Sequence, residues 1–268
     1  MGFAIDPAEL QADGTRVIDL RDDSAVQGAA WAALRSDPTI GVAVVREDGF
    51  TVWCNERAAV IFLGDDAKPR DAMGKPWREI FPEPWIKERL GILRQIKQTG
   101  QGVLLRTLWR GRQQGSWIRM IDPEPQDHDS EGFMSREKPD TDEPRASDGS
   151  SLSRFLIITR RMDAREFAEV EAKRDVEVID SDVVHLGDLD KLTARELEVL
   201  ALLGQGLTVA EIGEVLHRSP KTVDRHRDKL AKKLGGTNRV ELARVAFEAG
   251  LELSDASRRR TSSGPTLS

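Results

Sequence analysis

The sequence predicts an α+β protein with two domains of different character, an N-terminal antiparallel sheet with helices and a C-terminal all-α domain of four helices. The chain has 268 residues, and at about 100–200 residues per domain this length suits two domains. β-Branched runs and tight-turn signals lie before residue 164, whereas four capped helical segments follow residue 188. All six tryptophans precede residue 118, so the two cores differ in composition.

The net charge of −6 is unevenly distributed along the chain. Residues 1–190 carry 26 basic and 36 acidic side chains, whereas residues 191–250 carry 11 basic and 8 acidic ones. This asymmetry indicates an acidic module joined to one that meets phosphates.

Several protein classes are excluded by composition. No apolar run approaches the roughly 18 residues of a membrane helix, and mean hydropathy is −0.45. The first 20 residues contain four acids and no apolar centre, so we expect no secretory signal. The single cysteine, Cys54, excludes an internal disulfide framework and a cysteine-based zinc site. We therefore expect a soluble cytoplasmic protein without membrane contact.

The first module alternates strand and helix signals. Asp48-Gly49 separates two β-branched runs, a hairpin signal because glycine tolerates the positive φ of a tight turn. Gln113-Gln114-Gly115 is expected as a second hairpin loop. The expected elements are a lead-in at 1–36, strands at 40–45 and 50–54, a short helix at 55–63, a helix at 84–99 with Ile86, Leu90, Leu93 and Ile96 on one stripe, and strands at 103–109, 117–121 and 155–159.

An acidic, proline-containing stretch interrupts this module. Residues 122–148 hold ten acids, three bases and four prolines. Such a composition cannot bury enough apolar surface to offset the entropy of ordering, so we predict a disordered insertion at about 122–153. Residues 164–187 are expected to form a helical linker, and 254–268 a disordered tail.

The element order, the Asp-Gly hairpin and the run Trp53-Cys54-Asn55-Glu56-Arg57-Ala58 resemble a PAS domain over residues 37–163. The resemblance implies a five-stranded antiparallel sheet with helices over one face, often enclosing a ligand. A generic α+β domain is the alternative.

No ligand can be named for this domain. The helix at 84–99 has no histidine to hold haem, and Cys54 lacks the motif of light-sensing flavin domains. We therefore predict no cofactor and no metal site. The aromatic residues able to line a pocket are expected to be plain core, namely Trp53, Phe62, Trp77, Trp85 and Trp109.

Helix-start signals punctuate the second module, predicted at 188–253. Thr193-Ala-Arg-Glu196 and Thr208-Val-Ala-Glu211 are capping boxes, in which each side chain satisfies a free backbone amide near the other. Ser219-Pro220 places a cap before a proline at the first helical position, and Asn238 caps a fourth helix. This spacing predicts a helix-turn-helix bundle.

The same region resembles the LuxR-type DNA-binding domain. The matching runs are Leu192-Thr-Ala-Arg-Glu-Leu-Glu-Val-Leu200, Glu211-Ile212, Ser219-Pro-Lys-Thr-Val-Asp-Arg-His226 and Lys233-Leu234-Gly235. Gly213 departs from the alanine usual in the family. The resemblance implies that 208–216 is a supporting helix, that 219–234 enters the major groove, and that 239–250 contributes to dimerisation.

Periodicity assigns the two faces of the helix at 220–234. Val223, Leu230 and Leu234 are expected in the core, and Arg225 is the best candidate for a guanine contact because its fork matches two acceptors. Asp224 and Asp228 suit cytosine amino groups, the lysines and Thr222 suit phosphates, and His226 suits the DNA backbone. The predicted DNA-binding residues are Lys221, Thr222, Asp224, Arg225, His226, Asp228, Lys229, Lys232 and Lys233, and the predicted dimer contacts are Leu242, Val245 and Ala246.

These features predict a one-component transcriptional regulator, a homodimer that binds an inverted repeat in double-stranded DNA under the control of a PAS-like sensory or dimerisation module. RNA polymerase or an upstream signalling protein is a candidate further partner. One alternative is a PAS-based interaction scaffold with secondary DNA binding; another is a sigma-factor-like promoter-recognition protein. A receiver domain would need alternating βα units, and residues 37–163 do not show that pattern. No Gly-rich phosphate loop, metal-spaced histidine pair or Cys–His nucleophile is present, so we predict no catalytic residues and no enzyme.

Overall fold

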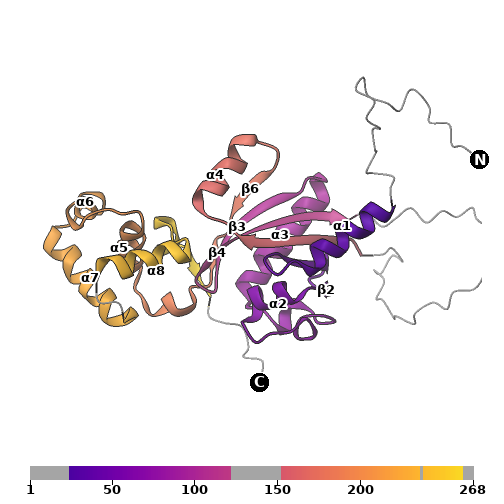
Figure 1. Ribbon diagram of the computed structural model, residues 1–268, viewed down its shortest axis with the longest axis horizontal. Coiled ribbons are helices and arrows are strands. Elements are labelled where there is room, and N and C mark those ends of the chain that lie inside the picture. The colour runs from indigo at the N-terminus through magenta and orange to yellow at the C-terminus, as the bar shows by residue number, and fades with distance from the viewer. Residues whose placement is uncertain (1–23, 122–151, 236–237, 262–268) are drawn as a thin grey trace, which may run out of the picture. The chain divides into compact units, whose positions relative to one another are not determined.

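The computed structural model describes residues 24–121, 152–235 and 238–261. The expectations of disorder for the insertion and for the end of the tail therefore fall largely outside the described residues. Helix α1 (Ser24–Ser36) belongs to a unit of its own, residues 1–37, and the remaining chain forms a second compact unit. The first five strands and the helices of the N-terminal domain are shown in Figure 1 and are β1 (Gly41–Arg46), β2 (Thr51–Cys54), α2 (Glu56–Leu63), α3 (Glu83–Thr99), β3 (Val103–Trp109), β4 (Arg112–Ile121), β5 (Arg154–Arg161) and α4 (Ala164–Lys173).

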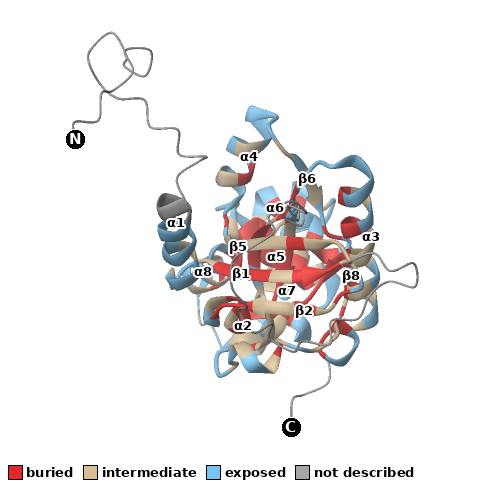
Figure 2. Ribbon diagram, turned by 90° about the vertical axis from the view of Figure 1, so that its right-hand side faces the viewer, coloured by how far each residue is buried: buried red, intermediate tan, exposed pale blue. Residues whose placement is uncertain are grey.

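These strands form an antiparallel sheet in the order β2-β1-β5-β4-β3. This is the five-stranded antiparallel sheet that the PAS resemblance implies, and the α+β fold class is confirmed. A sixth strand, β6 (Glu177–Asp180), adds to the β3 edge in parallel orientation. Helices α2 and α3 pack on one sheet face, and many of the buried residues lie in the sheet strands (Figure 2).

The local signals in this domain act as expected. Gly49 has a φ of +80° in the β1–β2 turn, where Asp48 Oδ1 accepts a hydrogen bond of 3.1 Å from the Phe50 amide. Asn55 caps α2 by accepting from the Ala58 amide at 2.9 Å. The same side-chain oxygen accepts from the Val42 amide at 2.9 Å, so one residue fixes α2 against β1.

Helix α3 is rotated from the predicted stripe. Leu93 and Ile96 are buried as expected, but Ile86 and Leu90 are only half-buried, and Trp85 and Arg89 take the inward positions. Arg89 is tolerated in the core because it pairs with Glu88 and donates to Thr107 Oγ1 and Ser181 Oγ, each at 3.3 Å. A hydrophobicity pattern cannot anticipate a cation whose partners come from other elements.

The second hairpin turns earlier than predicted. Its turn is Arg110-Gly111, with φ values of 52° and 69°, and two consecutive positive φ values match the right-handed twist of paired strands. Gln113 and Gln114 lie instead within β4, paired with Leu108 and Thr107. The expected loop at 113–115 is therefore wrong, because Arg110 adopts a left-handed conformation that sequence rules assign mainly to Gly, Asn and Asp.

The linker and the tail are also corrected by backbone pairing. Helix α4 ends at Lys173, so the linker is not one helix, and β7 (Val183–Val184) follows β6. Residues 259–260 form β8, which pairs in parallel with β7. The predicted disordered tail is therefore ordered as far as residue 261, because hydrogen bonds to the 182–184 backbone hold it.

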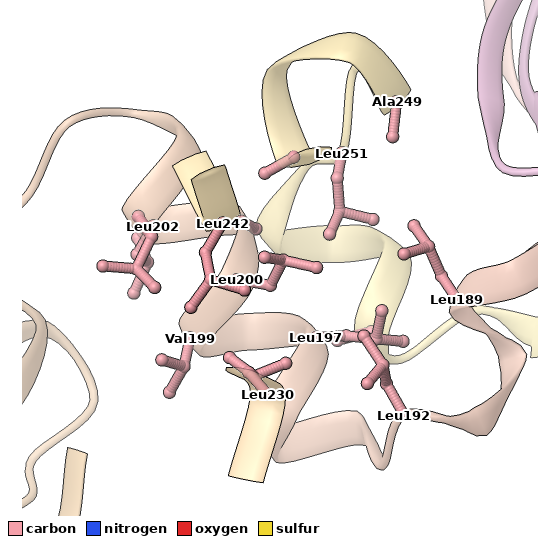
Figure 3. Close-up of a cluster of buried hydrophobic side chains, with 14 of the residues drawn as sticks. Leu189, Leu192, Leu197, Val199, Leu200, Leu202, Leu230, Leu242, Ala249 and Leu251 are labelled. Atoms are coloured by element: carbon pink, nitrogen blue, oxygen red, sulfur yellow. The ribbon is translucent and has the colours of Figure 1, made fainter. Parts of the chain in front are cut away.

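The C-terminal domain contains four α-helices with short 3₁₀ turns at Gly187–Lys191 and Leu253–Ala256. Its α-helices are α5 (Ala194–Gly204), α6 (Val209–Val215), α7 (Pro220–Leu234) and α8 (Arg239–Ala249). Leu197, Leu200, Leu230 and Leu242 converge in its core (Figure 3). None of the helices in the described ranges is long and apolar enough to span a bilayer.

The two domains share contacts at the β3–β4 hairpin. Leu108 of β3 belongs to the same buried cluster as Val184, Leu186 and Leu189, which lead into the C-terminal domain. Arg106 of β3 forms ion pairs with Glu171 at 2.8 Å, Asp180 at 2.6 Å and Glu252 at 3.5 Å. Arg106, whose side chain is largely buried, therefore links α4, β6 and the segment after α8.

Candidate nucleic-acid interface

Caps define each helix of the C-terminal domain. The Thr193 and Thr208 side chains accept from the Glu196 and Glu211 amides, and each glutamate reaches back to its threonine amide. Both predicted capping boxes are present. Ser219 Oγ accepts from the Thr222 amide at 3.2 Å at the start of α7, with Pro220 at the first helical position. These caps satisfy free amides and fix where α7 begins.

A tight turn joins α6 to α7. His217 has a φ of 51°, and the Arg218 amide donates 2.8 Å to the Gly213 carbonyl. A Cβ at Gly213 would lie 2.7 Å from the Arg218 carbonyl oxygen. The departure from the usual alanine therefore coincides with close backbone packing in the turn that orients α7.

Helix α7 has one buried and one exposed face. Val223 and Leu230 are buried and Leu234 is half-buried, as the periodicity predicts. The exposed side carries Lys221, Arg225, Asp228, Lys229 and Lys232. Basic side chains thus project from a helix that its apolar face holds on the core, a suitable arrangement for entry into a major groove.

Arg225 is available for a ligand. Its side chain is exposed, and within the described residues its guanidinium has no hydrogen-bond or ion-pair partner. It lies in the first half of α7, where recognition helices contact base edges. Of the predicted base-reading residues, Arg225 has the geometry that needs the least rearrangement.

Asp224 and Asp228 both pair with Arg227, which is not among the predicted DNA-binding residues. Arg227 lies 2.9 Å from Asp224 Oδ1 and 3.2 Å from Asp228 Oδ1. The single positive charge of Arg227 is shared between the two carboxylates, so it offsets part of the negative charge beside Arg225. The i, i+3 spacing of Asp224 and Arg227 is the signal from which this pair follows.

Lys233 points into the domain rather than away from it. Its Nζ lies 2.7 Å from Glu196 Oε2 and donates 3.0 Å to the Lys191 carbonyl oxygen. Burial acts to raise the pKa of Glu196, but hydrogen bonds from Lys233 and Thr193 outweigh it and hold that pKa below its usual range. Lys233 is therefore engaged within the domain.

His226 and Thr222 lie between the two faces. His226 is half-buried, and its Nδ1 is buried without a hydrogen-bond partner among the described residues. Burial lowers the pKa of His226, which favours the neutral ring at neutral pH. Thr222 Oγ1 lies 2.9 Å from Ser219 Oγ at the helix start.

The comparisons with known proteins bear on this domain. Residues 190–246 match the family described as bacterial regulatory proteins of the luxR family. The C-terminal domain is a LuxR-family domain. This chain is 52% identical over 62 residues to the transcriptional regulatory protein UhpA of Escherichia coli K12. It is 45% identical over 60 residues to the transcriptional activator protein SolR of Ralstonia nicotianae.

The matches to these relatives cover a small part of the chain. The match covers 23% of this chain and 32% of UhpA, and 22% of this chain and 25% of SolR. The chain therefore spans about a third or less of the length of these relatives.

Similar solved structures include the VqmA dimer of Vibrio cholerae and the PAS domain of BvgS from Bordetella pertussis. The VqmA match has a TM-score of 0.36 at 19% identity and covers 86% of this chain and 93% of that one. The BvgS match has a TM-score of 0.33 at 13% identity and covers 56% of this chain and 94% of that one. The PAS-like description rests on the strand order itself.

The predicted dimer contacts lie inside the LuxR-family domain. Leu242 and Ala246 are each 1% exposed in its core, and Val245 is half-buried against that core. The apolar side chains that α8 leaves exposed are Val240 and Phe247, which are 76% and 75% exposed. Their spacing of seven residues puts them on one face.

The PAS-like domain encloses a small apolar cavity of about 50 Å³. Phe62, Trp77 and Trp85 line it, whereas Trp109 packs in the core and Trp53 is half-buried on β2. A cavity of this size holds a few waters and is smaller than the roughly 300–1,000 Å³ of small-molecule sites. Cys54 also lines it, and burial raises the pKa of its thiol to about 11, so the thiol stays protonated at neutral pH.

Proposed function

We propose that the chain is a sequence-specific DNA-binding transcriptional regulator in which a PAS-like sensory or dimerisation module controls a LuxR-family domain. The observation that carries the proposal is the exposed basic face of α7. Arg225, which has no partner among the described residues, lies there in the first half of a helix held by Val223 and Leu230. No enzymatic activity is part of the proposal.

Recognition then proceeds from the N-terminal half of α7. Arg225 donates two hydrogen bonds to guanine O6 and N7 in the major groove. Lys221, Thr222, Lys229 and Lys232 contact phosphates, which position the domain without reading sequence. His226 contacts the DNA backbone. Asp224 and Asp228 accept from cytosine amino groups when Arg227 turns to a phosphate, and Lys233 supports the helix through Glu196.

The working form is a homodimer on an inverted repeat. One domain of this size buries too little surface for tight, selective binding, and two-fold proteins match palindromic sites. We assign the contact between the two copies to the exposed face of α8, with Val240 and Phe247 as its apolar centre. Leu242, Val245 and Ala246 act indirectly by holding α8 on the domain core.

The PAS-like domain reaches the LuxR-family domain through several contacts rather than through one linker helix. Gly111 donates 2.9 Å to the His185 carbonyl, and Gln113 Nε2 donates 3.0 Å to Glu252 Oε1. A change in the β3–β4 hairpin is therefore transmitted to both ends of the C-terminal domain. We place the protein in the cytoplasm, with RNA polymerase or an upstream signalling protein as a further partner.

Selection of bound DNA from a random pool by the full chain tests this function. We expect an enriched inverted repeat, on which Arg225→Ala costs about 1–3 kcal/mol and relaxes preference at one base position. Arg165→Ala removes the same charge from an exposed site on α4 and should leave binding unchanged. If no sequence is enriched while a partner protein binds, the scaffold alternative replaces this proposal.

A further inference from the structure

A second cleft, of about 700 Å³, lies where one end of the sheet meets residues 185–190. It differs from the apolar cavity in being lined mostly by polar side chains. Arg57 comes from α2, and Arg112, Gln114 and Arg161 come from the ends of β4 and β5. A cleft of this volume is in the size range of small-molecule sites.

The strand register brings three of these polar side chains together. Arg161 is directly opposite Gln114 in the β4–β5 pair, and Arg112 lies two residues from Gln114 on the same strand. Directly opposed side chains have Cβ atoms about 4.5–5.5 Å apart and diagonal ones about 7–8 Å apart. Arg112, Gln114 and Arg161 therefore share one sheet face at one end of the sheet.

These groups lack partners in the part of the chain that the structure describes. The side chains of Arg57, Arg112 and Arg161 form no ion pair there. Arg57 Nε and Gln114 Oε1 are both buried without a hydrogen-bond partner, and Gln114 is only 4% exposed. Buried polar atoms are usually satisfied, so an unpaired donor and an unpaired acceptor on two side chains that line one cleft favour a polar ligand there.

The chemistry of the open groups defines the ligand. Arginine guanidinium groups bind phosphate and carboxylate in bidentate fashion, whereas Gln114 Oε1 accepts from a hydroxyl or amino group. Asp65, Asp188 and Asp190 also line the cleft, and their carboxylates disfavour a second anionic group. We propose that this cleft binds a small organic anion with one phosphate or carboxylate group for the arginines and a hydroxyl or amino donor for Gln114.

The position of the cleft links it to the LuxR-family domain. Its wall includes Leu186, Gly187 and Asp188, a few residues before the Thr193 cap of α5. A bound anion thus contacts both the sheet and the segment that enters the C-terminal domain. Any effect on DNA affinity rests on the proposed function, whereas binding of the anion does not.

Isothermal titration of the full chain without DNA tests the site. The probes are glycerol 3-phosphate and glycerate, each with hydroxyl donors and one anionic group, a phosphate in the first and a carboxylate in the second, and glycerol is the neutral control. We expect at least one anionic probe to bind, and Arg112→Gln and Arg161→Gln each to weaken it about tenfold. Arg119→Gln is the matched control, because Arg119 is exposed on the opposite face of β4. The Gln114→Met substitution should weaken the binding of glycerol 3-phosphate more than the binding of inorganic phosphate.

The outcomes separate this site from others in the chain. Loss of binding in both arginine variants, with Arg119→Gln unchanged and equal melting temperatures, supports it. Absence of heat with every anionic probe at millimolar concentration overturns it. Equal affinity in the wild type and the Arg112 and Arg161 variants also overturns it and points to the basic face of α7. Because no DNA is present, a negative result leaves the test of DNA recognition unaffected.

Discussion

Lys233 and Glu196 tie the end of α7 to the start of α5, with Lys233 Nζ 2.7 Å from Glu196 Oε2. Glu196 is 2% exposed and also completes the Thr193 capping box. Helix α7 is therefore anchored at its C-terminal end by a carboxylate from the start of α5. Its orientation depends on this pair as well as on Val223 and Leu230.

Lys233→Ala should act on stability rather than on phosphate contacts. Removing the lysine leaves the Glu196 carboxylate buried with one charged partner fewer, which should lower the free energy of unfolding by about 1–3 kcal/mol. Lys232→Ala, at an exposed neighbouring position, should stay within about 0.5 kcal/mol. The Lys232→Ala variant should instead reduce the slope of log affinity for DNA against log salt concentration by about 1, because one phosphate contact is lost. Chemical denaturation and binding at several salt concentrations measure both effects, and a reduced salt slope in Lys233→Ala would contradict the assignment.

Asp255 should give the packing of the C-terminal segment a distinct pH dependence. Burial raises the pKa of Asp255 from 3.8 to about 6, against the lowering effects of the Glu252 amide and Arg258. The folded state therefore holds this proton more tightly than the unfolded state, so the contribution of Asp255 to stability falls as pH rises from 3.8 to about 6.

Asp255→Asn isolates this contribution because it removes the titrating group. The free energy of unfolding of the wild type minus that of the variant should increase by about 1–3 kcal/mol as pH falls from 7 to 4. Urea denaturation across that range measures the difference. A constant difference would show that Asp255 is ionised throughout in the folded protein.

The exposed face of α8 should control assembly without affecting folding. Phe247→Ser replaces a side chain that is 75% exposed, so the monomer should change in stability by no more than about 0.5 kcal/mol while the dimer dissociates. Leu242→Ala removes a core side chain and should cost about 2–5 kcal/mol of unfolding free energy. Sedimentation equilibrium measures the loss of the dimer in Phe247→Ser, and denaturation measures the loss of stability in Leu242→Ala. A dimer that persists in both Phe247→Ser and Val240→Ser would exclude this face.

The acidic insertion should be dispensable for folding. Ile121 and Arg154 are directly opposed at the ends of β4 and β5, so a short turn can connect the strands. Replacing residues 124–152 with a Gly-Ser turn should therefore leave cooperative thermal unfolding intact, since loop length alters closure entropy only slowly. Loss of the cooperative transition would contradict this. Tighter DNA binding by the same variant would indicate that the insertion shields the basic domain.

Local signals were sufficient for most of the element assignments. The caps at Asn55, Thr193, Thr208, Ser219 and Asn238 each begin the helix they predict, because a cap acts within three residues of the chain. The same applies to the hairpin at Gly49 and to the two faces of α7. The LuxR-family domain was also predicted from such motifs, and the family match at residues 190–246 confirms it.

Contacts between distant residues decided the rest. Burial of Arg89 depends on Thr107 and Ser181, the ordering of residues 259–261 depends on the 182–184 backbone, and the inward turn of Lys233 depends on Glu196. No local pattern encodes such partners, because each gains its stability from a group that only folding brings near. The sequence by itself determined where helices and most hairpins begin and which segment belongs to the LuxR family. The tertiary structure decided which charged side chains of the described residues are paired, since pairing and burial are properties of neighbours in space.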